Sequence, residues 1–222
     1  MAYDFDTIAR DYDRMNHLMT LGLDRRWRRL GTRAACPRNS AGRLPACHVL
    51  DVACGTGDMV LELMKRGCTV TGVDLSEEMI SIAKTKAPAT YILGDAEHLP
   101  FPDAAFDAVT CAFGVRNFVH LKQGLGEMLR VLKPGGRMVI LELATPDSVI
   151  IRPFYDFYAK HTIPLLGKWL AGNRTAYTYL PESIERFPKG EDFMQIIKEL
   201  GAAVVQHKQT FGVCRMYQIT KP

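Results

Sequence analysis

The feature that most limits the possible folds of this chain is the stretch LDVACGTGD at residues 50–58, where an apolar run ends in two glycines one residue apart. Such a stretch predicts a buried strand and then a turn whose backbone approaches a ligand or another segment closely. Apolar residues recur at helical spacing from Thr56 to Arg66, and Gly67 ends that pattern. This order of strand, loop and helix is typical of a parallel α/β sheet, which binds ligands beyond the carboxyl ends of its strands.

Short β-rich stretches alternate with helical patterns along the rest of the chain. Strands are predicted over HVLDVAC, TVTGVDL, TYILGD, FDAVTCAFG and RMVILELA. Ser76 is the expected N-cap of the helix after the second strand. A later helix presents one apolar face and is stopped by KPGG; the face consists of Leu121, Leu125, Met128, Leu129 and Leu132. The final stretches, VVQHKQT and CRMYQIT, predict an antiparallel hairpin that closes a doubly wound α/β sheet.

A chain of 222 residues is long enough for one α/β domain with a substantial core. We expect residues 1–222 to form a single domain, with an N-terminal helical cap over about 1–45 and an inserted substrate cap over about 145–190. The polar, acidic N-terminus and the absence of a long apolar run predict neither a secretory signal nor a membrane span. The expected location is the cytoplasm.

The cysteines and the arginines of the chain are informative in different ways. The six cysteines are scattered, with no CxxC pair and no histidine at metal-ligand spacing, which favours reduced cysteines and argues against a zinc site. Much of the formal charge of +4 surrounds Trp27, in Arg25, Arg26, Arg28, Arg29 and Arg33. This cluster predicts either a solvated helix face or a contact with anionic lipid head groups. A nucleic-acid surface is disfavoured because the rest of the chain is nearly balanced in charge.

Three classes of cofactor are bound by glycine loops of this kind. A triphosphate loop would need GxxxxGK followed by Ser or Thr, which is missing, and the dinucleotide fingerprint would need a small residue where Val60 stands. Asp74 ends the second predicted strand, where its carboxylate can accept hydrogen bonds from ribose hydroxyl groups. Asp95 ends the third, where its carboxylate and the Ala96 amide could meet the edge of an adenine. Two acids with no basic residue close by suit an adenosine that carries a positive charge and no phosphates, and S-adenosylmethionine is such a molecule. The alternative is that both acids are only helix caps or turn residues.

Several motifs stand in the order and spacing of a known family: LDVACGTGD, GVDLSEEM, GDAEHLPFPD, FDAVTCAFGVRN, EMLRVLKPGGRMVILEL and YTYLPESIERFP. Over nearly its whole length the chain resembles the menaquinone/ubiquinone biosynthesis C-methyltransferases, with AFGVRN and YTYLPESI as the narrowest signals. The resemblance implies a seven-stranded, Rossmann-like class I methyltransferase fold. It also implies S-adenosylmethionine-dependent methylation of a ring carbon on a prenylated quinol, with demethylmenaquinol as the favoured substrate.

The alternatives are a ubiquinone-pathway benzoquinol, another small phenolic or amine substrate, a nicotinamide-dependent oxidoreductase, and a non-catalytic protein that binds S-adenosylmethionine. Val60 and Asp95 disfavour the oxidoreductase.

The resemblance also implies which residues do the work. The cofactor-binding positions would be Gly55, Thr56, Gly57, Asp74, Asp95 and Ala96, and no metal is expected. Arg116 and Asn117 are the expected catalytic residues; because a guanidinium stays protonated, Arg116 would stabilise a phenolate rather than act as the base. Weaker candidates are His120, His161 and Tyr177 for catalysis, and Asp11, Tyr12 and Asn16 for the pocket wall.

The aromatic stretch RPFYDFYAKHTIPLLGKWL is a candidate for holding a polyprenyl tail. Phe154, Phe157 and Tyr158 share a helical face, a spacing that is equally typical of core packing, and Trp169 follows. We expect a protein that meets its lipid substrate peripherally, at the inner face of the cytoplasmic membrane, and that binds no nucleic acid. Ala112 replaces a serine common in relatives, and the unusual C-terminal stretch TFGVCRMYQITKP predicts an altered substrate entrance.

Overall fold

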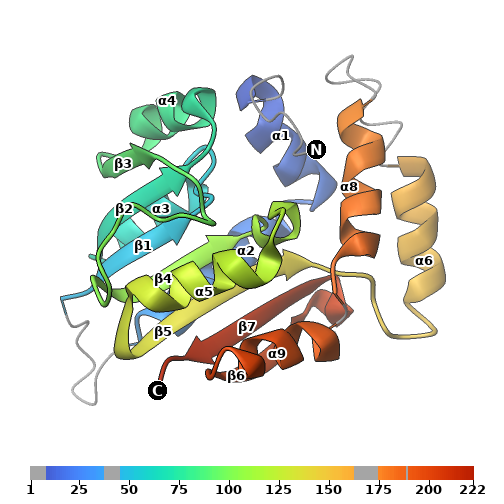
Figure 1. Ribbon diagram of the computed structural model, residues 1–222. Helices are drawn as coiled ribbons and strands as arrows, with labels where there is room; N and C mark the ends of the chain where they lie inside the picture. The colour runs from blue at the N-terminus through green and yellow to red at the C-terminus, as the bar shows by residue number, and fades with distance from the viewer. Residues whose placement is uncertain (1–8, 38–45, 163–174, 189) are drawn as a thin grey trace.

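A seven-stranded sheet forms the centre of the molecule (Figure 1). The structure is a computed structural model, and it describes residues 9–37, 46–162, 175–188 and 190–222. Its order is β3-β2-β1-β4-β5-β7-β6, and β7 pairs antiparallel with both β5 and β6. The strands are β1 (His48–Val52), β2 (Thr69–Asp74), β3 (Thr90–Leu93), β4 (Phe106–Ala112), β5 (Leu132–Leu143), β6 (Ala203–Gln209) and β7 (Cys214–Thr220). This order confirms the predicted doubly wound α/β sheet with its antiparallel last strand.

Helices connect and cover the strands. They are α1 (Ala9–Met19), α2 (Leu23–Ala35), α3 (Asp58–Lys65), α4 (Glu77–Lys86), α5 (Leu121–Val131), α6 (Arg152–Phe157), α8 (Thr175–Arg186) and α9 (Gly190–Glu199). The Ser76 hydroxyl accepts a hydrogen bond from the Met79 amide, which confirms the predicted N-cap of α4. The predicted end of α5 was wrong by one residue, because the backbone becomes extended at Leu132 and enters β5 there.

Both faces of the sheet are buried, as the alternation of side chains along β1 shows. Leu50 and Val52 join the core formed with α5 and α9, whereas Val49 joins the core formed with α2 and α3. Because successive side chains of a strand point to opposite faces, Asp51 shares the face of Val49. A carboxylate is therefore built into the core beneath α2, at the end of β1 that leads into the glycine loop.

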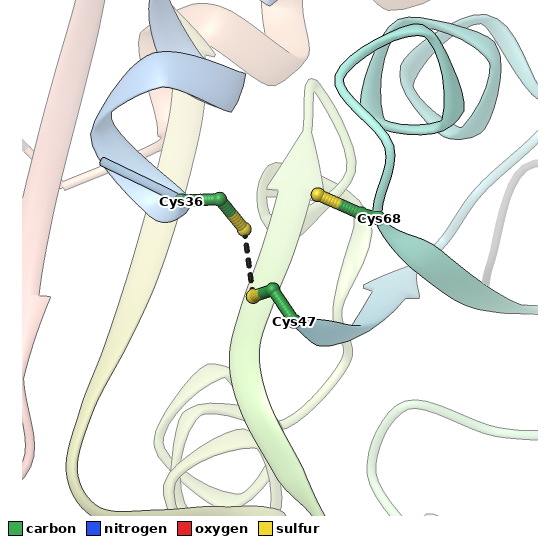
Figure 2. Close-up of side chains that lie close together, drawn as sticks. All are labelled: Cys36, Cys47 and Cys68. Carbon is green, nitrogen blue, oxygen red and sulfur yellow. Dashed lines mark hydrogen bonds between the residues drawn. The ribbon is translucent and has the colours of Figure 1, made fainter. Parts of the chain in front are cut away.

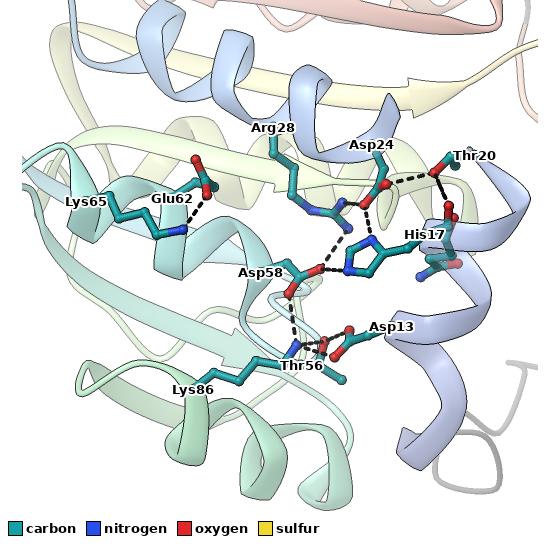
Figure 3. A network of polar contacts seen from close by, with 11 residues as sticks. Asp13, His17, Thr20, Asp24, Arg28, Thr56, Asp58, Glu62, Lys65 and Lys86 are labelled. Atoms are coloured by element: carbon teal, nitrogen blue, oxygen red, sulfur yellow. Dashed lines mark hydrogen bonds and ion pairs between the residues drawn. The ribbon is translucent and has the colours of Figure 1, made fainter. Parts of the chain in front are cut away.

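A polar network fastens α1 and α2 to the sheet domain (Figure 3). Arg28 forms ion pairs with Asp24 and, at 3.9 Å, with Asp58 at the start of α3. Lys86 at the end of α4 pairs with Asp58 at 2.9 Å and with Asp13 on α1. Arg28 and Asp24 are buried, whereas Asp13, Asp58 and Lys86 are partly exposed, so this network runs from the interior towards the surface and holds α1 against the glycine loop.

The arginine cluster divides into a buried member and an exposed stripe. Arg28 is only 7% exposed, so both predicted interpretations, a solvated face and a lipid contact, were wrong for this residue. Its charge is matched by acids, and its guanidinium lies 5.1 Å from the centre of the Phe113 ring. The other four arginines are exposed: Arg25, Arg26, Arg29 and Arg33. Helical spacing places them opposite the inward face of α2, a placement that favours a solvated surface.

The remaining helices border the carboxyl edge of the parallel strands. In Figure 1, α6 and α8 lie side by side next to this edge, and α1 lies between α8 and α4. A π-helical turn, Tyr158–Thr162, continues α6. Within the residues that the structure describes, no helix combines the length and apolar character needed to cross a bilayer.

Candidate functional site

In the described part of the chain, a first large cavity opens where β1, β2, β3 and β4 end. It has a volume of about 300 Å³ and is bordered by the glycine loop and by the segments that follow these strands. The structure brings together here five of the eight residues that the sequence analysis selected: Gly55, Asp74, Asp95, Ala96 and Asn117. The site thus lies at the carboxyl edge of the sheet, where ligands of open α/β sheets bind.

Asp74, the last residue of β2, organises the glycine loop. Its carboxylate accepts hydrogen bonds from the amides of Gly55, at 2.7 Å, and Ser76, at 3.0 Å. The same carboxylate lines the first cavity, and each of its oxygens has two lone pairs. Asp74 can therefore fix the loop and accept the hydroxyl groups of a ribose at the same time.

Asp95 lies two residues beyond the end of β3, the strand next to β2, and it also lines this cavity. Its carboxylate accepts the Glu97 amide at 2.8 Å, and its side chain is 42% exposed. Ala96 beside it is 8% exposed and lines the cavity. Ala112 also lines the cavity, so its side chain offers no hydroxyl group there.

Thr56 and Gly57 are not part of the wall of the first cavity. The Thr56 hydroxyl donates to Asp13 and accepts from Lys86 at 3.1 Å, so it ties α1 to the loop. Gly57 has a φ of +84°, and a Cβ there would lie 3.0 Å from the Cβ of Ala83. Both residues therefore fix the conformation of the loop. Thr56 does so through the polar network, and Gly57 does so through its close approach to α4.

A third, much smaller cavity of about 20 Å³ lies between the glycine loop and α2. Tyr12, Arg28 and Asp51 line it, and the Asp51 Oδ2 atom is buried without a hydrogen-bond partner in the described part of the chain. Thr110 donates to the other oxygen at 2.6 Å. Burial raises the pKa of Asp51 to about 7. The third cavity shares Tyr12, Ala53 and Gly55 with the first, so Asp51 and Arg28 lie beside the first cavity. From there a carboxylate suits the ammonium group of an amino acid, and a guanidinium suits its carboxylate.

The second large cavity, of about 320 Å³, lies beyond Phe113. Its lining comes from α1, α2, α6, α8 and the turn before β7, and it is mostly apolar. Its lining includes Leu21, Phe154, Tyr158, Arg116 and Phe211. Tyr12 and Phe113 line both large cavities, so the two spaces meet at these two side chains.

Arg116 and Asn117 occupy the 3₁₀ turn Val115–Asn117 that separates the two cavities. Asn117 lines the first and Arg116 the second. The Arg116 guanidinium forms an ion pair with Glu142 at 2.7 Å; the side chains of these two residues are 6% and 1% exposed. It also donates to the Phe113 carbonyl and, at 3.3 Å, to the Ser183 hydroxyl of α8. A rigidly held cation therefore faces an apolar space.

The backbone at this junction is unusual. Ala53 and Phe113, just past the ends of β1 and β4, have positive φ values of 52° and 65°, which are rare for residues other than glycine. A Cβ on Gly114 would lie 2.7 Å from the Cβ of Ala53 and 2.8 Å from the Cys111 sulfur. The two strand ends are thus packed too tightly for a larger residue, and strained backbone of this kind concentrates at functional sites.

The weaker candidates for catalysis and for the pocket wall lie in different parts of the structure. His120 is 68% exposed on its side chain and pairs with Glu97 at 2.8 Å, outside both large cavities. His161 is exposed and its ring contacts Phe157. Tyr12 and Asn16 line the second cavity as predicted. The side chains of Asp11 and Tyr177, and all of Trp169, lie outside the described residues.

The predicted aromatic face of 154–158 is split by the structure. Phe154 and Tyr158 line the second cavity, whereas Phe157 is 65% exposed and does not. Thr210 and Phe211 of the unusual C-terminal stretch also line this cavity. Sequence reasoning missed Asp51 and Glu142, although an acid inside an otherwise apolar strand is a recognisable signal in both LDV and LEL.

Comparisons with known proteins agree with this geometry. The model of the ubiE/COQ5 methyltransferase family matches residues 2–221. A demethylmenaquinone methyltransferase of Deinococcus radiodurans is 42% identical over 220 residues, which cover 96% of this chain and 89% of that protein. The ubiquinone/menaquinone biosynthesis C-methyltransferase UbiE of Geobacter sulfurreducens is 43% identical over 224 residues, which cover 96% and 85%.

Solved structures are also similar in fold. A chain of a complex that contains the Haloferax volcanii Trm112 methyltransferase activator superposes with a TM-score of 0.69 at 18% identity, and the match covers 100% of this chain and 99% of that chain. At that identity the similarity concerns the fold alone.

Proposed function

This chain belongs to the ubiE/COQ5 methyltransferase family, and from that premise we propose that it methylates a ring carbon of a prenylated quinol, with demethylmenaquinol as the favoured substrate. It is an S-adenosylmethionine-dependent methyltransferase. The observation that supports the substrate class is that a cavity lined by the acids Asp74 and Asp95 meets a mostly apolar cavity at Tyr12 and Phe113. A ubiquinone-pathway benzoquinol is the alternative, because relatives of almost equal identity carry both names.

The first and third cavities fit S-adenosylmethionine. Asp74 would accept the ribose hydroxyl groups, and Asp95 with the Ala96 amide would meet the adenine edge. The buried oxygen of Asp51 and the guanidinium of Arg28 would hold the ammonium and carboxylate groups of the methionine part. Thr56 and Gly57 would contribute by shaping the loop. We expect residues 1–222 to act as one catalytic unit in which the described parts of the segments 1–45 and 145–190 help to cover the cavities.

The protein's part in the reaction is to orient the quinol and to favour its ionised form. S-adenosylmethionine, when bound, supplies an electrophilic methyl group. A free phenol has a pKa of about 10, so a group that stabilises the phenolate makes the ring carbon a better nucleophile near neutral pH. Arg116, held by Glu142 in the wall of the second cavity, is the cation placed for this task. Asn117 lines the first cavity, so its part would be to contact the ring oxygen where the two cavities meet. The apolar walls exclude water, which strengthens the interaction.

A transfer experiment tests this proposal. The purified protein is incubated with S-adenosylmethionine carrying a deuterated methyl group, and with demethylmenaquinol, a ubiquinone-pathway benzoquinol or an unprenylated phenol. We expect the label on a ring carbon of the naphthoquinol, as found by mass spectrometry. Label only on the benzoquinol would establish the alternative. Binding of the cofactor without a labelled quinol would refute the proposal.

Phe154 tests whether the second cavity holds the prenyl tail. The Phe154→Ala variant removes apolar surface from the cavity wall, so we expect its KM for a long-tailed quinol to rise about 3- to 10-fold. Its KM for a quinol with one prenyl unit should change less than twofold. Phe157→Ala is the matched control, because Phe157 belongs to the same helix and is exposed but does not line the cavity. Equal effects on both quinols would contradict tail binding.

We further propose that the mouth of this cavity rests on the membrane. Leu21, Phe154 and Phe211 line the cavity and are nevertheless 72%, 73% and 74% exposed, so they form an apolar rim. Exposed apolar residues grouped around an opening are typical of contact with a lipid phase. The double variant Leu21→Ser/Phe211→Ser should bind lipid vesicles at least about 10-fold more weakly. Val205→Ser, a change at a residue 57% exposed on β6, should bind like the parent protein in co-sedimentation. Unchanged binding of the double variant would contradict the rim.

The acid in the third cavity predicts a pH dependence of cofactor binding. Because burial raises the pKa of Asp51 to about 7, lowering the pH from about 8 to about 6 adds a proton to its carboxylate. The negative charge that favours the bound ammonium group is then lost, so the affinity for S-adenosylmethionine should fall over this range. Calorimetry at constant ionic strength measures it. Asp51→Asn should bind weakly with a flat profile, and an unaltered pH slope in this variant would contradict the role of Asp51.

A further inference from the structure

Three cysteines from separate parts of the sequence meet on the α2 side of the sheet, away from the catalytic cavities (Figure 2). Cys36 caps the carboxyl end of α2, Cys47 precedes β1 and Cys68 precedes β2. All three are buried, at 2%, 9% and 8% exposure. The fold therefore assembles a cluster that the spacing of the cysteines in the sequence does not indicate.

The sulfur positions suit a metal ion. The three sulfur atoms lie within 4.8 Å of one another, and those of Cys36 and Cys47 are 2.8 Å apart. A metal–sulfur distance of about 2.3 Å places the sulfurs of a three-coordinate site about 4 Å apart. Small rotations of the side chains would bring the cluster to that geometry without moving the backbone elements.

A cation stands next to the cluster. The Arg66 guanidinium donates to the Cys36 carbonyl at 2.7 Å, and its Nε atom is buried with no acceptor in the described part of the chain. Sulfur atoms of thiolates are acceptors, and a positive charge beside them favours the ionised form that binds metals. Arg66 thus offsets part of the negative charge that three thiolates would bring into the core.

We propose that Cys36, Cys47 and Cys68 form a three-thiolate site for a soft monovalent metal ion of the copper(I) class. Thiolate ligands select such ions, and the cluster contains three donors among the described residues. Zinc almost always takes four ligands in structural sites, so it fits this set less well. On binding, each thiol that becomes a ligand releases its proton to solvent, and the metal keeps its oxidation state. The bound ion links the end of α2 to β1 and β2.

The test is an anaerobic titration of the fully reduced protein with copper(I) against a chromogenic copper(I) chelator. We expect the wild-type protein to retain one equivalent of copper(I), and Cys68→Ala to bind at least about 100-fold more weakly. Cys214→Ala is the matched control, since Cys214 is buried in the same core but stands outside the cluster, and it should bind like wild type. Binding of S-adenosylmethionine by each variant checks that it folds.

X-ray absorption of the copper(I) protein should find three sulfur neighbours. Three results would overturn the proposal: a wild-type protein that loses its copper as readily as Cys68→Ala, a two-sulfur site that persists in Cys68→Ala, and tighter binding of zinc than of copper(I). The outcome is independent of methyl transfer, because the cluster lies outside the three cavities.

Discussion

Replacing Arg116 by lysine is expected to lower kcat for quinol methylation at least about 100-fold, with the Kd for S-adenosylmethionine within about twofold of wild type. The guanidinium is held on Glu142, on the Phe113 carbonyl and on the Ser183 hydroxyl, three acceptors that fix its plane at the wall of the second cavity. An ammonium group keeps the charge but cannot make the same set of contacts. The phenolate would then lose a positioned cation, whereas the cofactor cavity would keep its wall.

The alanine variant separates this role from a purely structural one. Arg116→Ala leaves the buried Glu142 carboxylate without its ion-pair partner, which should lower the free energy of unfolding by about 3–5 kcal/mol. Arg116→Lys should lose much less stability and most of its turnover. Arg130→Lys is the control, because Arg130 also pairs with acids, Glu127 and Asp103, but far from the cavities. If Arg116→Lys keeps more than about a third of the wild-type kcat, Arg116 has no part in the chemistry.

Replacing Asp74 by asparagine should raise the Kd for S-adenosylmethionine about 100-fold. The carboxylate accepts two backbone amides and lines the cofactor cavity with its remaining lone pairs. An asparagine amide carries one oxygen only, so its NH₂ group would face either the Gly55 amide or the Ser76 amide. The loss of a charged acceptor accounts for about 1.5–3 kcal/mol, and the displaced loop adds to it.

Asp103→Asn is the matched control for this change, since Asp103 is 79% exposed and pairs only with Arg130 among the ion pairs of the described residues. Its Kd should equal that of the wild type. Because Asp74 also shapes the loop, the melting temperature of both variants is measured alongside the affinity. A Kd for Asp74→Asn within about threefold of wild type would remove Asp74 from the cofactor site.

The sequence alone predicted the sheet well because its signals are local. Each strand is a short apolar run, and the turns between them carry glycine or capping residues such as Ser76, whose bond to Met79 is a contact between neighbours in the chain. The acids at the ends of β2 and β3 could also be placed on one edge of the sheet from the sequence, because the carboxyl ends of parallel strands meet there.

What could not be predicted depends on contacts between distant segments. Arg28 appeared to belong to a surface stripe, and only the packing of α2 against α3 and Phe113 shows it in the interior. Arg116 and Asn117, adjacent in sequence, face different cavities because a 3₁₀ turn divides them. Glu142, 26 residues from Arg116, holds the catalytic candidate and gave no signal of that pairing.

The most direct test of the account is a crystal structure with S-adenosylhomocysteine and a short-tailed naphthoquinol. The account predicts the adenosine between Asp74 and Asp95, the amino-acid end beside Asp51, and the quinol ring in the second cavity. The ring carbon that accepts the methyl group should then face the cofactor sulfur past Phe113, with Arg116 at a ring oxygen. A quinol bound outside the second cavity, or with its ring turned away from the cofactor, would contradict the account.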